Sequence, residues 1–578
     1  MSASGISDVT GHEPSGSAAL RRLRSLGAES WIMLAGIAAI CAALIVFLAL
    51  PLYALLKKSV EDDKGVFVGL ANFQEYFASV GLVQSISNSL TIAFLTMIIS
   101  CVLAFTFAYG LTRTCMPFKR AFRAIATIPI LAPSLLPAIS LVYLFGNQGV
   151  IKALLFGESI YGPIGIMIAM VFYIFPHVMM IMVTALSTTD ARLYEAADAL
   201  GTRPARVFFT ITIPGAIYGI VSAMVVAFTL TITDFGVPKV IGGQYNVLAT
   251  DIYKQVVGQQ NFSMGAVVGL VLLIPAVFSF LIDRHVKKKQ VALLSARAVP
   301  YHPKPHKLRD AGLLIFCCLI AVFLIGIIGM ALFASLATFW PYDLSLTLAH
   351  YDFDAVDPNG WSSFFNSLKM AGLTSVIGVI IIFLGAYLVE KGQNFPHLRG
   401  VFHMLAIVPM AVPGLVLGLA YVFFFSKPEN PLSLIYGTMA ILVVCTVVHF
   451  YTVSHLTMIT ALKQIDKEFE AVSASLKVPF YRTMFRVHVP ICLPVISEVM
   501  MYLFVNAMTT VSAVVFLYSP DTKLAAITVL NLDDVGDQAE AAAMSMVIIA
   551  TSVTVRVAHA LLMRGLNARH SAWRTRTD

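Results

Sequence analysis

Twelve long apolar segments, separated by shorter polar ones, dominate the pattern along this chain of 578 residues. Each is close to the roughly 20 residues that an α-helix needs to cross about 30 Å of hydrocarbon. The segments span residues 31–56, 86–112, 122–145, 161–186, 213–235, 263–283, 311–337, 366–390, 401–425, 434–460, 490–515 and 541–562. The pattern therefore predicts an all-α polytopic membrane protein with about twelve transmembrane helices.

Composition supports that fold class, and the distribution of charge orients it. Hydrophobic residues make up 58% of the chain and charged residues only 12%, and the mean hydropathy is +0.84. With the N-terminus inside, 30 of the 39 Lys and Arg residues fall in inner segments or at the inner ends of spans. The positive-inside rule then predicts that both termini are cytoplasmic. The net charge of +8 is a topology signal, so no nucleic-acid partner is expected.

The reactive side chains predict neither a metal centre nor an active site. Six of the seven cysteines lie in or at the ends of apolar segments, and none forms a CxxC or Cys/His metal spacing. No GxxxxGK[ST] sequence for ATP binding occurs. No His/Asp/Glu cluster or Ser–Lys pair supports an intramembrane enzyme. We therefore expect a chain that is not an enzyme, with no catalytic residue, no metal and no cofactor of its own.

The two halves of the chain repeat each other. The shared landmarks are Asn88-Ser89-Leu90 with Asn366-Ser367-Leu368 at an offset of 278, and Pro133, Pro137 and Pro214 with Pro409, Pro413 and Pro490 at an offset of 276. Six spans in each half give the halves the same orientation, so two parallel six-helix repeats are expected. The prolines either bend their spans around a cavity or are tolerated kinks, and the sequence does not decide between these.

Polar segments complete the expected organisation. It comprises a disordered cytoplasmic tail over 1–28, a first transmembrane permease domain over 29–283, a basic cytoplasmic linker over 284–310, a second transmembrane permease domain over 311–563 and a basic cytoplasmic tail over 564–578. The first tail is rich in Ser, Gly and Ala with little periodicity, which is typical of disorder. The linker contains prolines that oppose a continuous helix.

A polar loop in the first half predicts a short capped helix. The loop reads Glu195-Ala196-Ala197-Asp198-Ala199-Leu200-Gly201 and runs on to Pro214. The preceding 187–190 segment supplies capping side chains, Gly201 is placed to end a helix in the left-handed conformation, and Pro214 is placed to begin the next span. Residues 193, 196, 197 and 200 share one face at helical spacing. Its alanines keep that face narrow, so a partner surface can approach closely.

An imperfect copy of this loop lies about 275 residues downstream. It reads Glu470-Ala471-Val472-Ser473-Ala474-Ser475-Leu476 and runs on to Pro490. Aligned on its glutamate, the copy has Leu476 where Gly is expected, and Pro490 comes one residue late. Asp466 is a candidate cap. An ordinary amphipathic helix resting on lipid headgroups is the alternative interpretation, which duplication at equivalent places of a parallel repeat disfavours.

The first loop resembles the signature loop of binding-protein-dependent ABC importer permeases. The shared pattern is Glu-Ala-Ala, three residues, Gly, nine residues, Ile, any residue, a hydrophobic residue and Pro, which this chain matches from Glu195 to Pro214. The resemblance implies a coupling helix that sits in a cleft of an ATPase subunit. The implied ATPase-coupling residues are Glu195, Ala196, Ala197, Gly201 and Pro214 in the first half and Glu470, Ala471, Leu476 and Pro490 in the second.

The same resemblance implies partners and a location. Two copies of a cytoplasmic ABC ATPase, which use ATP and Mg, would dock at the two loops, and a periplasmic substrate-binding protein would deliver substrate. The chain would be a multi-pass protein of the bacterial inner (plasma) membrane. Nearly the whole chain, through its fused halves, residues 69–73 and the paired Asn-Ser-Leu triplets, resembles the iron(III)-type permease group. Residues 472–480 and 506–518 look most like the 2-aminoethylphosphonate permeases of that group, which implies a phosphonate substrate, with iron(III) as the alternative.

Few charged residues lie deep in the predicted spans, where a charge costs about 2.5–3.5 kcal/mol. Asp234, near the outer end of the fifth span, and Asn506, Thr509 and Thr510 at the matching place in the second half are the expected lining of a translocation pathway. For Asp234, a cap on the next segment is the alternative. The rival function from another class is an ion-coupled secondary transporter, which the scarcity of acids within the spans disfavours.

Overall fold

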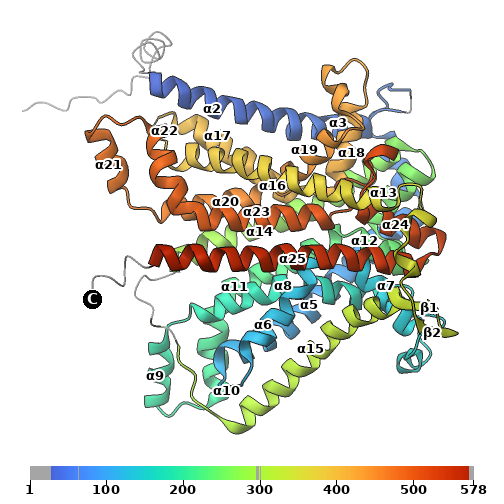
Figure 1. Ribbon diagram of the computed structural model, residues 1–578, viewed down its shortest axis with the longest axis horizontal. Coiled ribbons are helices and arrows are strands. Elements are labelled where there is room, and N and C mark those ends of the chain that lie inside the picture. Colours follow the sequence, from blue (N-terminus) through green and yellow to red (C-terminus); the bar gives the residue numbers. More distant parts are fainter. Residues whose placement is uncertain (1–27, 63, 294–298, 300, 393, 572–578) are drawn as a thin grey trace, which may run out of the picture.

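The computed structural model describes residues 28–62, 64–293, 299, 301–392 and 394–571 (Figure 1). The predicted disordered tail, except for its last residue, and part of the predicted linker lie outside the described residues. Two helices extend into segments predicted to be polar connections. The helix that begins at Phe262 continues to Leu293, and the last helix continues to Ser571.

The first half of the chain consists mainly of helices joined by loops. Its elements are α2 (Ala28–Leu44), η1 (Ile45–Ala49), α3 (Leu50–Ser59), α4 (Ala71–Ala78), α5 (Val80–Arg113), α6 (Lys119–Thr127), η2 (Ile128–Leu131), α7 (Leu135–Phe145), η3 (Lys152–Leu155), α8 (Pro163–Ser187), α9 (Ala191–Ala199), α10 (Pro204–Val207), η4 (Phe208–Thr212), α11 (Ile213–Thr233), α12 (Gly236–Ile241), α13 (Leu248–Tyr253), η5 (Lys254–Gly258) and α14 (Phe262–Leu293). Segments η1, η4 and η5 are π-helical, and η2 and η3 are 3₁₀-helical.

The second half follows the same order, with a short hairpin added after its first span. Its elements are α15 (Lys307–Leu336), β1 (Ala337–Phe339), β2 (Asp343–Leu346), η6 (Ala349–Tyr351), η7 (Phe353–Ala355), α16 (Gly360–Glu390), α17 (Pro396–Ile407), η8 (Val408–Ala411), α18 (Gly414–Phe425), η9 (Pro431–Ile435), α19 (Met439–His449), α20 (Tyr451–Lys463), α21 (Glu468–Ser475), α22 (Phe480–Thr483), η10 (Met484–His488), α23 (Val489–Thr509), η11 (Pro520–Thr522), α24 (Ala525–Val535) and α25 (Gln538–Ser571). The two strands pair antiparallel, with Ala337 opposite Leu346 and Phe339 opposite Asp343.

The predicted fold class is confirmed. Among the described residues, nine helices are long and apolar enough to cross a membrane, and three bent helix pairs bring the number to twelve. Two predicted spans, 122–145 and 401–425, are sharply broken, and a third, 434–460, bends by 54°. The chain turns by 103° between η2 and α7 and by 111° between η8 and α18. The prolines of the first two spans therefore lie at sharp breaks rather than at slight kinks.

The structure also corrects how these prolines correspond. Pro129 lies in the first positions of η2, as Pro409 does in η8. Pro133 and Pro413 each follow the 3₁₀ turn and accept a backbone hydrogen bond in the first turn of the next helix. The pairing of Pro133 with Pro409 and of Pro137 with Pro413 was therefore wrong. Pro137 lies inside α7, because this part of the first half is shifted by four residues.

The serines of the two Asn-Ser-Leu triplets, in contrast, make equivalent hydrogen bonds in the two halves. Ser89 Oγ accepts a hydrogen bond of 2.8 Å from the backbone N–H of Leu248, and Ser367 Oγ accepts one of 2.8 Å from Ala525. These contacts tie α5 to the start of α13 and α16 to the start of α24. The serines satisfy backbone N–H groups that would otherwise be unpaired at a helix start.

Each half packs its first span against the other half. Helices α2 and α3 contact α16, α17 and α18, whereas α15 contacts α5, α6 and α7. The two hydrophobic cores follow this exchange, since one joins Ile37 and Leu48 to the second half and the other joins Cys317 and Leu324 to the first. In Figure 1, α9 and α21 lie at one end of the long axis, and α13, α24 and the β1–β2 hairpin lie at the other. We call these the α9/α21 end and the α13/α24 end.

Candidate functional site

The predicted short helix of the first loop forms as α9. The Asp190 carboxylate accepts a hydrogen bond of 3.1 Å from the backbone N–H of Arg192, so it caps the helix. Gly201 has φ +62, and its N–H donates to the carbonyl of Asp198 at 3.0 Å. A left-handed residue just past the last helical turn is a common helix ending, for which glycine is favoured.

Helix α21 forms at the matching place, but one residue away from the predicted alignment. The backbone N–H of Leu476 donates to Val472, as Leu200 donates to Ala196. Lys477, with φ +52, stands where Gly201 stands. The structural offset is therefore 276 at both ends of the loop, and the statements that Leu476 replaces the glycine and that Pro490 comes late were wrong.

The corrected register changes which residues are equivalent. Glu195 corresponds to Ala471, and Glu470 corresponds to Tyr194. Glu195 is exposed on α9, whereas Glu470 is half-buried and accepts hydrogen bonds inside its own half. The Lys391 ammonium lies 2.6 Å from the Glu470 carboxylate. Burial alone would raise the pKa of Glu470, but the hydrogen bonds from Lys391 and His488 hold it below its usual value.

Pro214 and Pro490 stand in the first positions of α11 and α23, as predicted. The helical segments nevertheless begin earlier, and they run unbroken from Pro204 to Thr233 and from Phe480 to Thr509. A π-helical turn precedes each proline, η4 in the first half and η10 in the second. The wider turn shifts the hydrogen bonding by one residue just before a ring that has no N–H to donate. The prolines are therefore accommodated within a continuous helix.

Both short helices present an exposed apolar stripe at identical spacing. The stripe of α9 consists of Leu193, Ala196 and Leu200, and the stripe of α21 consists of Phe469, Val472 and Leu476. Leu200 is 82% exposed and Leu476 is 69% exposed. Ala197, predicted on the same face as Leu200, is buried. Large exposed apolar side chains on a loop are a feature of interaction surfaces.

The described part of the linker packs on α9, which nothing in the sequence predicted. The backbone carbonyl of Val299 accepts a hydrogen bond of 3.0 Å from Ala191. The Tyr301 ring lies 4.7 Å from the Tyr194 ring, and Lys304 pairs with Asp198. The Asp198 carboxylate raises the pKa of Lys304. The first short helix is thus held by the linker between the two halves.

The residues predicted to line a pathway fall into two groups. Asp234 and Thr510 are the residues that directly follow α11 and α23, with nearly identical backbone angles. The Asp234 carboxylate accepts a hydrogen bond of 2.9 Å from the N–H of Val237, so it caps α12 as the alternative interpretation had it. Asn506 and Thr509 hydrogen-bond to carbonyls of their own helix. A role of these four residues in transport stays a prediction.

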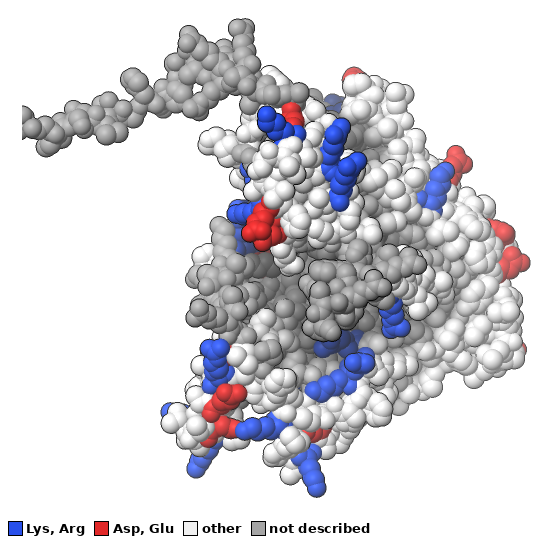
Figure 2. Space-filling view, turned by 60° about the vertical axis from the view of Figure 1, so that its left-hand side comes forward, with Lys and Arg blue, Asp and Glu red and all other residues white. Residues whose placement is uncertain are grey.

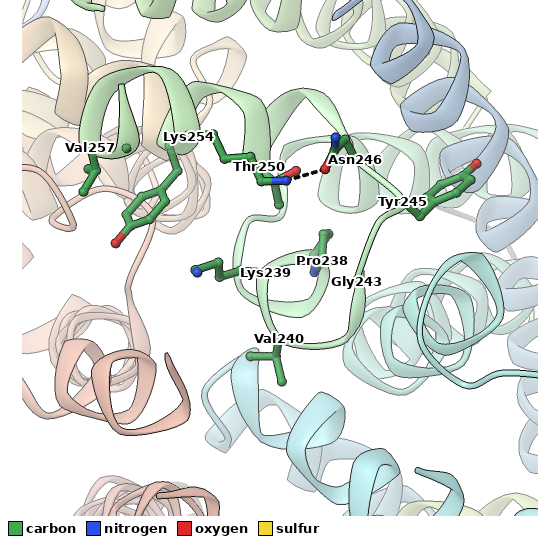
Figure 3. Close-up of a pocket in the computed structure, with 11 residues that line it drawn as sticks. Pro238, Lys239, Val240, Gly243, Tyr245, Asn246, Thr250, Lys254 and Val257 are labelled. Carbon is green, nitrogen blue, oxygen red and sulfur yellow. Dashed lines mark hydrogen bonds between the residues drawn. The ribbon is translucent and has the colours of Figure 1, made fainter. Parts of the chain in front are cut away.

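A basic pocket of about 310 Å³ lies at the α13/α24 end (Figure 3). Its lining residues are Pro238, Lys239, Val240, Gly243, Tyr245, Asn246, Thr250, Tyr253, Lys254, Val257 and Gly258. Lys254 donates a hydrogen bond of 2.5 Å to the Asn246 side chain, and both lie along one wall of the pocket in Figure 3. The lining holds two lysines and no carboxylate, which favours an anionic group.

Contacts next to this pocket connect the two halves. Lys239 lies 2.7 Å from Asp534 of α24, and the Tyr253 and Phe516 rings are stacked at 6.2 Å. Neither contact has a signal in the sequence, because the partners are hundreds of residues apart. Among the described residues, no group of three or more His, Cys, Asp or Glu side chains is placed to hold a metal ion.

Two tandem six-span repeats, each with a short polar helix exposed at the same end, define a multi-pass membrane permease. The comparisons with known proteins agree. Two segments, 112–291 and 381–568, match the family "Binding-protein-dependent transport system inner membrane component". The segments lie one in each half and together cover more than half of the chain, which therefore belongs to this family of multi-pass inner-membrane transport subunits.

Individual relatives share the whole two-half arrangement or one half of it. The ferric transport system permease protein FbpB of Actinobacillus pleuropneumoniae is 26% identical over 490 residues, which cover 82% of this chain and 70% of the relative. The putative ferric transport system permease protein FbpB 1 of Haemophilus influenzae is 27% identical over 459 residues, covering 77% and 71%. A probable sulfate transport system permease protein of Nephroselmis olivacea is 26% identical over 237 residues, covering 40% and 81%.

Proposed function

We propose that this chain is the membrane subunit of an ATP-driven importer, in which α9 and α21 are the docking helices for two copies of an ABC ATPase. The observation that carries the proposal is the pair of apolar stripes, which repeat at an offset of 276 on two otherwise polar helices. An external ATPase would bind ATP and Mg, so this chain would need no nucleotide site. A periplasmic binding protein would deliver the substrate to the α13/α24 end.

The distribution of basic residues supports this orientation. Of the 39 Lys and Arg residues, 30 belong to the predicted inner segments or to the inner ends of spans, and these segments include the α9 and α21 loops. Figure 2, in which the α9/α21 end comes forward, shows Lys and Arg side chains along the upper and lower parts of this face. By the positive-inside rule, this end is cytoplasmic. Both termini are then cytoplasmic as well.

The contacts between the halves indicate which side is closed. Lys239–Asp534 and Tyr253–Phe516 join the halves at the α13/α24 end. In Figure 1, α9 and α21 lie on opposite sides of α25 at the other end. In the proposed cycle this is a state closed toward the periplasm. Closure of the ATPase pair would bring α9 and α21 together and, through rigid-body motion of the halves, open the outer contacts.

Iron(III) is the substrate that we propose first, because the two ferric permeases named above resemble this chain over both halves. A specific observation favours a second candidate, 2-aminoethylphosphonate or a related phosphonate. The pocket at the outer end is lined by two lysines. Lys239 pairs with Asp534, and Lys254, which hydrogen-bonds to the Asn246 side chain, is the cation that a phosphonate group would meet. The motifs at residues 472–480 and 506–518 point to the same candidate.

Uptake by cells that carry or lack the chain tests the proposal. Loss of radiolabelled iron(III) uptake on deletion supports the first substrate, and loss of 2-aminoethylphosphonate uptake supports the second. In membrane vesicles, uptake of the active compound should require ATP. Uptake that follows an ion gradient without ATP would overturn the ATP-driven importer in favour of a secondary transporter.

A prediction about the outer closure follows from the Lys239–Asp534 pair. Lys239→Glu places a carboxylate beside Asp534, so it should weaken the closed state and raise ATP hydrolysis without binding protein about threefold, as expected for a partly exposed pair. The double variant Lys239→Glu/Asp534→Lys should restore the low basal rate. Lys254→Glu is the matched control, since Lys254 lines the same pocket but pairs within its own half. A basal rate unaffected by Lys239→Glu would contradict this closure.

A further inference from the structure

Three equivalent positions surround the inner side of each short helix, and they carry different chemistry in the two halves. In the first half they are Arg113, Tyr194 and Thr212, and in the second half Lys391, Glu470 and His488. Each set joins the end of the second span, the short helix and the π-helical turn before the fifth span. The positions correspond at offsets of 276 to 278.

In the first half the connection is a stacked cation and one hydroxyl contact. The Arg113 guanidinium lies 4.8 Å from the centre of the Tyr194 ring, within the range of a cation–π interaction. The Tyr194 hydroxyl donates a hydrogen bond of 3.1 Å to Thr212. Tyr301 of the linker completes the stack, 4.4 Å from the same guanidinium.

In the second half the connection is ionic. The Glu470 carboxylate lies 2.6 Å from the Lys391 ammonium and 2.9 Å from His488 Nε2. The side chains are 18%, 7% and 0% exposed, respectively, so water screens these contacts little. Lys391 also donates a hydrogen bond of 3.2 Å to the carbonyl of Ile465, just before α21. One ammonium thereby holds both the loop and the helix that follows it.

These contacts make a direct ATPase-binding role for Glu470 a poor fit. Its carboxylate is already bound from the inner side, and the exposed position equivalent to Glu195 is Ala471. Removing one partner of a buried charge pair leaves the other charge buried and unpaired, which is strongly destabilising locally. The carboxylate is thus well suited to hold α21 in place.

We propose that Glu470 is a positioning residue, which couples α21 to the ends of α16 and α23 through Lys391 and His488. Movement of α21 is then passed to these spans through the ionic contact between Glu470 and Lys391. In the first half, the Arg113–Tyr194 stack has the same place. The consequence for transport rests on the proposed function, in which α21 receives the ATPase. The anchoring itself is a property of the isolated chain.

Hydrogen exchange of the full-length chain in detergent tests the anchoring without an ATPase. In Glu470→Gln, the amides of α21 should exchange about fivefold faster than in the natural chain, because the helix opens locally more often. Glu468→Gln is the matched control, since it removes an exposed carboxylate from the same helix. Exchange in Glu470→Gln that equals the control would overturn the proposal. A chain whose ATPase binds neither α9 nor α21 would refute the proposed function but leave this result standing.

Replacing the second-half residues by those of the first half distinguishes a positioning role of Glu470 from a general loss of stability. The triple variant Lys391→Arg/Glu470→Tyr/His488→Thr gives the second half the three equivalent residues of the first, without Tyr301 of the linker. It should restore slow exchange in α21 and, with ATPase and binding protein present, stimulated ATP hydrolysis. Glu470→Tyr alone should lower stimulation about tenfold while ATPase binding persists. A triple variant no better than Glu470→Tyr, or stimulation unchanged in Glu470→Tyr, would overturn the proposal.

Discussion

Replacing Leu200 and Leu476 together by Asp is expected to abolish ATP-dependent uptake while the chain still folds and inserts. Each leucine is largely exposed, Leu200 to 82% and Leu476 to 69%, so its replacement disturbs little inside the chain. At a docked ATPase surface, however, each introduced aspartate would bury its carboxylate in an apolar contact. Hot-spot truncations in interfaces cost about 2 kcal/mol or more, or roughly 30-fold in affinity for each site. ATPase binding to the purified chain and uptake by cells are the measurements.

The control for this pair is Leu434→Asp. Leu434 is 86% exposed but belongs to η9, outside both short helices, so ATPase binding should be unchanged. The single variants then show whether the two docking helices contribute equally, which we expect because the residues of the two stripes have identical spacing. Full uptake and ATPase binding in Leu200→Asp/Leu476→Asp would rule out the stripes as docking surfaces.

Replacing Gly219 by Val is expected to reduce the yield of folded protein more than any loop substitution. A Cβ at this position of α11 would lie 2.2 Å from the Ala185 Cβ of α8, a separation at which the two helices must move apart. Overpacking of a core typically costs 1–3 kcal/mol, and a backbone-close helix crossing lies at the upper end, about 3 kcal/mol. The thermal midpoint in detergent and the recovered monodisperse fraction measure the loss.

Gly326→Val provides the matched comparison, because it makes the same change inside another apolar helix. Nothing lies within 4 Å of the Cβ that would be added on α15. This variant therefore measures the effect of Val on the helix itself, without a steric clash with a neighbouring helix. We expect its thermal midpoint to stay close to that of the natural chain. Equal midpoints for the two variants would mean that α8 and α11 do not cross closely at Gly219.

The candidate site shows where sequence patterns suffice and where they do not. Spacing predicted the α9 helix, its N-terminal cap within residues 187–190 and the left-handed conformation of Gly201, because capping depends on residues within one turn. The second loop was aligned by matching Glu470 to Glu195, so its predicted register was shifted by one residue from the register in the structure. The backbone angle of Lys477 and the contacts of Glu470 show the true register, which the offset of 276 between Pro214 and Pro490 already favoured. A side chain's direction is set by neighbours that local sequence does not name.

The same distinction holds for the pathway and the outer closure. Asp234 and Thr510 were correctly matched across the halves, since they follow helices of equal length. Lys239 and Asp534, which join the halves, were not singled out, because each is an ordinary surface charge in its own segment. Pro129 went unpaired because a local shift of four residues hides its equivalence to Pro409 until the two 3₁₀ turns are seen.

The amino-acid sequence by itself determined the number of spans, their two-fold repetition and the ends to which the polar loops belong. These properties depend on the transfer of each segment between water and hydrocarbon, which residues contribute one by one. The tertiary structure alone decided that α2 and α3 pack on the second half, that α15 packs on the first, and that Glu470 faces Lys391 and His488. In a membrane, lipid is as apolar as a neighbouring span, so the choice among apolar partners rests on close packing and on a few buried polar contacts.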